Sequence, residues 1–139
     1  MSDSINLVLV GLGLIGKRHA DIIEKTEDAK LLAIVDPSEE AHNYAVEKSL
    51  PIYGSLEDMF LEQSPDGIIL ATPTPMHSKQ GLICIHKKCP VMIEKPIANS
   101  SQEACDLVEK AENLGVPILV GHHRRYNPII QKAKNIIIS

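Results

Sequence analysis

The sequence predicts an α/β fold in which helices cover both faces of a parallel β-sheet. Short apolar segments alternate with segments of helical periodicity along the 139 residues, which is typical of successive strand–helix units. Parallel strands that are buried on both faces are apolar almost throughout, as these segments are. Because crossovers between parallel strands are right-handed, few topologies remain, and the doubly wound strand order 3-2-1-4-5-6 is the leading choice.

The expected strands are short runs rich in Ile, Leu and Val, bounded by Gly, Pro or polar residues. In chain order they cover residues 5–10, 30–35, 52–53, 68–71, 91–93 and 118–120. Gly11 ends the first strand. The second ends at Asp36-Pro37, because Pro37 cannot donate a hydrogen bond to a neighbouring strand.

Capping residues predict where the helices begin. The expected helices start, in order, near residues 14, 38, 55, 74, 100 and 128. Thr74 is followed by Pro75, which is favoured at a first helical position, and Ser100 forms a capping box with Glu103. Helical spacing predicts that the first helix buries Ile15, His19, Ile22 and Ile23. By the same spacing, the fifth helix is expected to bury Ala104, Leu107, Val108, Ala111 and Leu114.

The loop between the first strand and the first helix, Gly11-Leu12-Gly13-Leu14-Ile15-Gly16, matches the pattern G-x-G-x-x-G. Its position after a strand and at the start of a helix indicates a Rossmann dinucleotide-binding fold. Gly11 allows a tight turn, Gly13 lets a diphosphate approach the backbone, and Gly16 lets helix and strand pack closely. The helix N-terminus adds free N–H groups and about half a unit of positive charge. We therefore expect all six residues of this loop at the cofactor.

Asp36 is the second element of the predicted cofactor site, because it follows the second strand and lies 20 residues after Gly16. Its carboxylate can accept hydrogen bonds from the adenosine ribose and would repel a 2′-phosphate. At about 4 Å and an effective dielectric constant near 20, that repulsion is on the order of 4 kcal/mol per unit charge. This predicts NAD, with NADP the less favoured alternative, since Lys17 and Arg18 can still bind a phosphate.

Composition excludes several other classes. The chain has 14 Lys and Arg against 18 Asp and Glu, a net charge of −4, and no basic block, which argues against a nucleic-acid groove. No apolar run approaches the ~20 residues that span a bilayer, and the polar, acidic start is no signal peptide.

The three cysteines lack framework spacing, so we expect reduced thiols in a cytoplasmic protein. His122 and His123 lack a third ligand and are expected to point to opposite faces, so no metal site is predicted.

Three further segments, at residues 71–77, 94–96 and 121–128, follow the fourth, fifth and sixth expected strands. Ligands of open α/β sheets bind at this edge, where Gly11 and Asp36 also lie. With the glycine loop, these segments resemble the glucose–fructose oxidoreductase and inositol dehydrogenase (Gfo/Idh/MocA) family. The resemblance covers the whole chain but only the N-terminal half of a family member. It divides the chain into a dinucleotide-binding domain at residues 1–121 and a connecting segment at 122–139, which leads towards a C-terminal substrate domain absent from this sequence.

The resemblance implies an NAD-dependent oxidoreductase that transfers hydride between the cofactor and a sugar, inositol or related polyol. Lys95, in a Glu-Lys-Pro motif, is the implied catalytic residue. Further implied cofactor-binding residues are Thr72, Pro73, His77, Glu94, Lys95 and Arg124. Without a substrate domain, the chain itself is expected to bind NAD with little or no turnover. Two alternatives stay open: a non-catalytic NAD-binding sensor or adaptor, and a fragment of a longer gene. The chain is also a candidate for a homo-oligomer, formed through the apolar residues 136–138.

Overall fold

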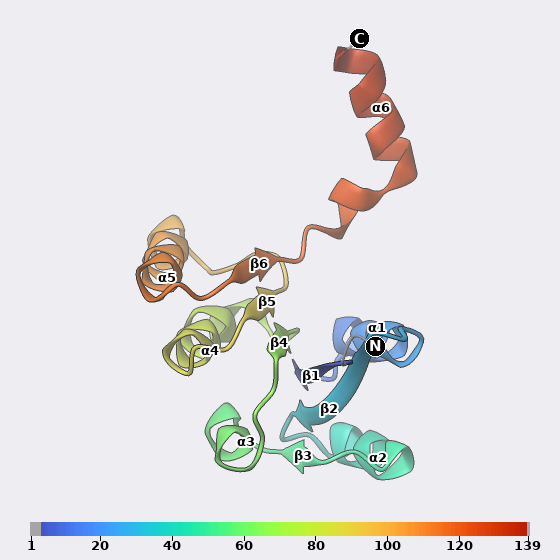
Figure 1. The fold of residues 1–139 in the computed structure, drawn as a ribbon, viewed down its shortest axis with the longest axis vertical. Coiled ribbons are helices and arrows are strands. Elements are labelled where there is room, and N and C mark those ends of the chain that lie inside the picture. Colours follow the sequence, from blue (N-terminus) through green and yellow to red (C-terminus); the bar gives the residue numbers. More distant parts are fainter. Residues whose placement is uncertain (1–3, 139) are drawn as a thin grey trace.

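Six parallel strands form a single sheet in the order β3-β2-β1-β4-β5-β6, which confirms the predicted doubly wound topology (Figure 1). The strands are β1 (Ile5–Val10), β2 (Ala29–Val35), β3 (Ile52–Tyr53), β4 (Gly67–Leu70), β5 (Val91–Ile93) and β6 (Ile118–Val120). The structure, a computed structural model, describes residues 4–138. The chain start at residues 1–3, on which the signal-peptide expectation partly rests, and residue 139 lie outside this range.

Six α-helices accompany the sheet within residues 4–138, and the first five form a layer on each side of it. They are α1 (Leu14–Glu24), α2 (Glu39–Lys48), α3 (Leu56–Glu62), α4 (Thr74–His86), α5 (Ser101–Leu114) and α6 (Pro128–Ile138). Helices α1 and α2 cover one face, and α3, α4 and α5 cover the other (Figure 1). Successive residues of β1 point to opposite faces, so Val8 and Val10 pack with α3–α5 whereas Leu9 packs with α1 and α2.

The register of the strands brings their carboxyl ends to one edge of the sheet. Val10 at the end of β1 pairs with Val35 of β2 and with Leu70 of β4. Leu70 pairs in turn with Ile93 of β5, which pairs with Val120 of β6. Each loop that follows these five residues therefore starts at the same level of the sheet, as the ligand-binding edge of this fold requires.

Two predicted helix faces are wrong in part. On α1 the buried residues are Gly16, Ala20 and Ile23, whereas Ile15 and Ile22 are 40% and 61% exposed. The reason is steric, because a Cβ on Gly16 would lie 2.0 Å from the Gly11 carbonyl oxygen, so only a glycine-centred face fits against the loop. On α5, Leu114 is 39% exposed, because the helix ends there and Gly115 turns the chain back.

The start of α4 also differs from its prediction. Thr74 is already helical and Pro73 occupies the N-cap position, so Pro75 lies at the second helical position and Thr74 caps nothing with its side chain. The other predicted caps are confirmed. Ser38, Ser55 and Ser100 accept hydrogen bonds from the backbone of Ala41, Asp58 and Glu103.

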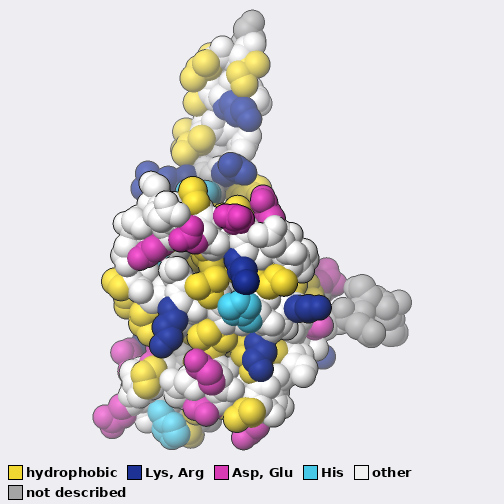
Figure 2. All heavy atoms as spheres, turned by 90° about the vertical axis from the view of Figure 1, so that its left-hand side faces the viewer, with side chains coloured by type: hydrophobic (Ala, Val, Ile, Leu, Met, Phe, Trp, Pro, Cys, Tyr) yellow, Lys and Arg dark blue, Asp and Glu magenta, His cyan; other side chains and the backbone are white. Residues whose placement is uncertain are grey.

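Helix α6 extends away from the sheet as a separate projection (Figures 1 and 2). A short 3₁₀ helix, η1 (His123–Tyr126), links it to β6. The residues of α6 are all exposed, including Ile129 at 78% and Ile137 at 83%. Apolar surface of this extent on a projecting helix is typical of a segment that packs against another structural unit.

Candidate functional site

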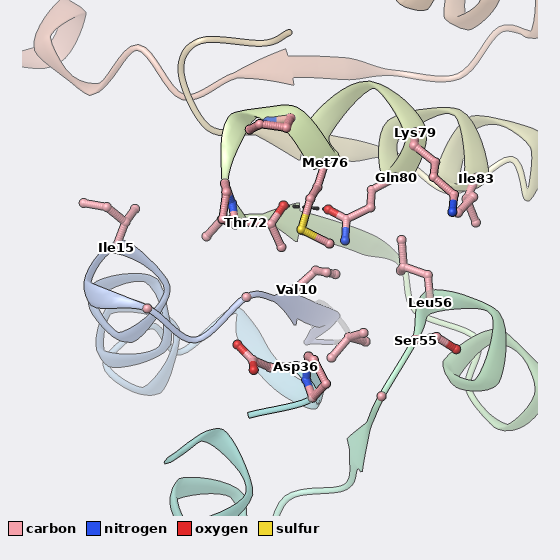
Figure 3. A pocket seen from close by; sticks show the side chains of 18 of the residues that line it. Val10, Ile15, Asp36, Ser55, Leu56, Thr72, Met76, Lys79, Gln80 and Ile83 are labelled. Carbon is pink, nitrogen blue, oxygen red and sulfur yellow. Dashed lines mark hydrogen bonds between the residues drawn. The ribbon is translucent and has the colours of Figure 1, made fainter. Parts of the chain in front are cut away.

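A large cavity of about 860 Å³ lies at the carboxyl ends of β1, β2 and β4 (Figure 3). Its lining includes Gly11 and Gly13 after β1, Asp36 after β2, and Thr72 and Pro73 after β4. Residues expected at the cofactor from three separate parts of the sequence therefore surround one space. We call this space the large cavity.

Each glycine of the loop meets a different environment. Gly11 has a φ of +87°, and a Cβ there would lie 2.9 Å from the Ala71 carbonyl group, so the turn requires glycine. Gly16 packs against Gly11, as described above. A Cβ on Gly13, in contrast, would meet no atom within 4 Å. The protein's own packing therefore does not require glycine at position 13, and the free space faces the large cavity.

The N-terminus of α1 offers donors to that free space. Gly13 is the N-cap residue, no side chain caps the helix, and its first turn contains no acidic residue. The N–H groups of a first helical turn have no partner within the helix and favour an anion. Leu14 and Ile15 line the large cavity beside them. This end of α1 can therefore hold phosphate oxygens.

Asp36 is held by backbone donors. Its Oδ2 accepts a hydrogen bond of 2.7 Å from the Leu12 N–H, and its Oδ1 accepts one of 2.8 Å from the Ser38 N–H. Burial raises the pKa of Asp36, but the hydrogen bonds from Ser38 and Leu12 outweigh it and hold the pKa below its ordinary value of 3.8. The carboxylate is therefore charged at neutral pH. Leu12 is buried and absent from the cavity lining, so its contribution is to orient Asp36.

Lys17, which the sequence left open as a phosphate ligand, is paired. Its Nζ donates a hydrogen bond to Glu40 Oε1, which joins α1 to α2. Glu40 offsets the positive charge that Lys17 could offer to a 2′-phosphate. Arg18 is exposed and takes part in none of the ion pairs of the described residues, so it stays open as a phosphate ligand.

His77 is not where the resemblance implies it. It is 1% exposed and does not line the large cavity. Its Nε2 lies 2.7 Å from the Thr72 carbonyl oxygen, and its Nδ1 lies 2.8 Å from the Pro96 carbonyl oxygen. A neutral imidazole can donate to one of these oxygens and an imidazolium to both. His77 therefore joins the loops after β4 and β5, while Thr72 and Pro73 themselves line the cavity.

Lys95 and Arg124 line a second cavity of about 340 Å³, together with Gly121, His122 and His123. We call it the basic cavity, and none of its lining residues is shared with the large cavity. His122 and His123 were expected to point apart. They follow the end of β6, in the loop and in η1, and both line this cavity.

Glu94 lies beside the basic cavity and acts structurally. Its Oε1 is 2.8 Å from Nε2 of His19 on α1, and its Oε2 accepts a 3.2 Å hydrogen bond from the Lys95 N–H. A Cβ on Gly121, the residue after β6, would lie 3.0 Å from the Glu94 carboxyl group, so a larger residue there would displace this carboxyl group. Glu94 therefore ties α1 to the ends of β5 and β6. His19, which was expected to pack on the apolar face of the first helix, is instead the hydrogen-bond partner of Glu94.

Sequence reasoning missed the wall of the large cavity opposite the glycine loop. Leu56 of α3 and Met76, Lys79, Gln80 and Ile83 of α4 line it, and Thr72 Oγ1 donates a 2.6 Å hydrogen bond to Gln80 Oε1 (Figure 3). Helical spacing places the four α4 residues on one face, which is the signal that could have found them. Within residues 4–138, no three His, Cys, Asp or Glu residues lie close enough to hold a metal ion. No helix in that range has the length and apolarity to cross a membrane.

The fold and the large cavity together define a dinucleotide-binding Rossmann domain. A family model extends this result. The chain belongs to the Gfo/Idh/MocA family, whose model describes an oxidoreductase family with an NAD-binding Rossmann fold and matches residues 5–122. The predicted family and its cofactor, NAD, are thereby confirmed.

Individual relatives agree with this family. The chain is 29% identical to a 4-carboxy-2-hydroxymuconate-6-semialdehyde dehydrogenase of Sphingobium sp. over 97% of its own length and 44% of the relative's. It is 28% identical to an inositol 2-dehydrogenase of Mycolicibacterium smegmatis over 99% and 41% of the two lengths. The WlbA dehydrogenase of Bordetella pertussis, solved with NADH and UDP-GlcNAcA, is similar with a TM-score of 0.92, 29% identity, and coverage of 97% and 40%. The chain thus spans about two fifths of these proteins.

Proposed function

We propose that this chain holds NAD(H) for an oxidoreductase that acts on a hydroxyl group of a sugar, inositol or related polyol. The observation that carries the proposal is the large cavity, which joins the free space over Gly13, the charged Asp36 and the Thr72-Pro73 turn. Its volume of about 860 Å³ lies within the range of ligand sites. The relatives, among them an inositol 2-dehydrogenase, support a polyol-type substrate class.

The residues of the large cavity fit the parts of a dinucleotide. The N–H groups after Gly13 would hold the diphosphate, as helix N-termini do in this fold. Asp36 would accept hydrogen bonds from the adenosine ribose with the lone pairs that Leu12 and Ser38 leave free. The apolar Leu56 and Ile83 suit a flat ring, and Thr72 and Pro73 would meet the other half of the ligand.

The bound nicotinamide would accept or supply the hydride, and Lys95 would serve the hydroxyl group. Lys95 is exposed in the loop after β5, and no acidic side chain of the described chain forms an ion pair with it. Lys95 can donate a hydrogen bond to the hydroxyl oxygen and hold a proton beside it, which is the role of a general acid–base residue. Glu94 fixes the backbone of Lys95 through the Lys95 N–H.

The proposal also covers the domain boundary and the location of the protein. Residues 1–121 form the dinucleotide-binding domain, and residues 122–139, with η1 and α6, connect it to a second unit against which the apolar face of α6 packs. That unit, or a second copy of the chain, would cover Ile129 and Ile137. The three free thiols, with Cys84 and Cys89 buried, favour a cytoplasmic location.

Calorimetric titration of the chain with NADH and with NADPH tests the proposal. We expect NADH to bind more tightly by on the order of 10² to 10³, because the charge on Asp36 repels a 2′-phosphate by up to a few kcal/mol. Asp36→Asn should reduce this ratio to less than about tenfold. Equal affinities of the unaltered chain for both cofactors, or binding of neither, would overturn the assignment.

A further inference from the structure

The basic cavity has a chemical character that the contacts proposed for NAD in the large cavity do not explain. Of its five lining residues, Lys95 and Arg124 are basic, His122 and His123 are histidines, and Gly121 has no side chain. No acidic residue lines it, although the chain as a whole carries a net charge of −4. Figure 2 shows basic side chains and a histidine where the α6 projection joins the body of the molecule. The cavity therefore concentrates positive charge in an acidic protein.

This charge has no counterion within residues 4–138. The ion pairs there are Lys17–Glu40, His19–Glu94 and Lys48–Glu24, and none includes Lys95 or Arg124. Glu94 is the nearest acid in the sequence, but its two carboxylate oxygens face His19 and the Lys95 N–H. Two cations that converge on one cavity without an acidic partner favour an anionic ligand, which they bind through charge-assisted hydrogen bonds.

The position of the cavity indicates which molecule carries the anionic group. The large cavity follows the ends of β2, β1 and β4, and the basic cavity follows β5 and β6, the next strands along the same edge. The diphosphate has its own donors at the start of α1, so it does not need these cations. What lies beyond the cofactor along this edge, beside Lys95, is the substrate.

We propose that the basic cavity binds an anionic group of the substrate, a carboxylate or a phosphate, through Arg124 with His122 and His123, while Lys95 faces the hydroxyl group. This inference rests on the proposed function, because it assigns a substrate class to the same edge. The substrate is then a sugar acid or a sugar phosphate rather than a neutral polyol. Arg124, whose guanidinium can hold two oxygens at once, is the residue that selects it.

Three ligands with the same sugar ring distinguish a neutral substrate from one with a carboxylate or a phosphate. They are D-glucose, D-glucuronate and D-glucose 6-phosphate. Each is titrated into isotope-labelled chain at low ionic strength, with and without saturating NADH, while backbone amide chemical shifts are followed. We expect saturable shifts at residues 121–124 with glucuronate, with glucose 6-phosphate, or with both, and none with glucose. The charged ligand that binds identifies the group as a carboxylate or a phosphate.

Two variants control for general charge. Arg124→Gln should weaken binding of the charged sugar by about tenfold or more, the effect of one lost charge-assisted hydrogen bond. Arg125→Gln removes the same charge from the neighbouring residue, which does not line the cavity, and should change binding less than about twofold. Equal effects of the two variants, or equal responses to all three sugars, would overturn the inference. NADH shifts at residues 11–16 report the proposed function separately, so either assignment can fail without the other.

Discussion

The three glycines of the phosphate loop look equivalent in the motif, but the structure distinguishes them. A Cβ on Gly13 meets nothing, whereas one on Gly16 lies 2.0 Å from the Gly11 carbonyl oxygen. We predict that Gly13→Ala lowers NADH affinity by tenfold or more, on the order of 1.4 kcal/mol, with less than about 1 kcal/mol lost in the free energy of unfolding. Gly16→Ala should destabilise the fold by about 1–3 kcal/mol or more. Urea unfolding and NADH titration of both variants measure this, and similar losses of stability would contradict it.

His77 offers a second residue-scale prediction. Both of its ring nitrogens contact backbone carbonyl oxygens, those of Thr72 and Pro96, in part-buried hydrogen bonds. His77→Leu leaves these oxygens without their donor, so the free energy of unfolding should fall by roughly 1–3 kcal/mol per oxygen that loses a hydrogen bond. His86→Leu, at an exposed position on the same helix, is the matched control and should change it by less than about 0.5 kcal/mol. Equal effects in urea unfolding would refute the bridging role.

Asp36 leads to a prediction about pH. Its pKa lies below the ordinary value of 3.8, because hydrogen bonds to the carboxylate outweigh burial. The charge, and the stabilisation it gives, is thus present above that value and lost only as the pH falls through the lowered pKa. The preference for NADH over NADPH should therefore persist between about pH 5 and pH 8, and it should weaken only as far as the 2′-phosphate itself loses its second charge near pH 6. Affinity ratios measured across this range check it, and equal affinities for the two cofactors at pH 5 would contradict the role of Asp36.

Residues of the site were predictable where a local pattern encodes them. The glycine loop and Asp36 follow from a motif and its spacing, and the structure brings both to one cavity. The partnership of His19 and Glu94 joins residues 75 positions apart, so no local pattern could indicate it. The same holds for Leu56, which reaches the cavity because α3 packs beside α4. Helical spacing suggested an apolar role for His19, and only tertiary contact supplied its partner.

At the level of elements, the strands were predicted better than the helix faces. The strand at Ile5–Val10 matches its prediction, because an apolar run bounded by Gly11 is a strong local signal. The inward faces of α1 and α5 were wrong at Ile15, Ile22 and Leu114, because apolar character alone does not tell which side of a helix meets the sheet. On α1 the close contact between Gly16 and Gly11 decides it.

Helix capping gives a prediction at this scale. The Ser100 side chain accepts a 3.2 Å hydrogen bond from the Glu103 N–H at the start of α5, which packs on α4 and the sheet. Ser100→Ala should lower the free energy of unfolding by about 1 kcal/mol, within the usual range of roughly 0.5–2 kcal/mol. Ser101→Ala, one residue later and without a capping role, is the control, and thermal unfolding compares the two. A larger loss for Ser101→Ala would argue against the cap.

For the whole molecule, the proposed chemistry depends on more than this chain. Lys95 is the single residue assigned here to the chemistry, and the chain spans about two fifths of its relatives. Without positioned proton transfer a reaction slows by about 10² to 10⁴, and loss of substrate positioning adds to this. We predict that the chain binds NAD yet produces no measurable NADH with sugars, sugar acids or polyols. Robust NADH formation in such a screen would contradict this prediction. NAD binding without NADH formation is also what a sensor or adaptor module would show.

A crystal structure of the chain grown with NAD would show directly whether the large cavity holds the cofactor. We expect diphosphate oxygens within hydrogen-bond distance of the N–H groups that follow Gly13. We also expect a ribose hydroxyl on Asp36 and a base between Leu56 and Ile83. Electron density for NAD at another surface, or a glycine loop in contact with none of its atoms, would contradict it.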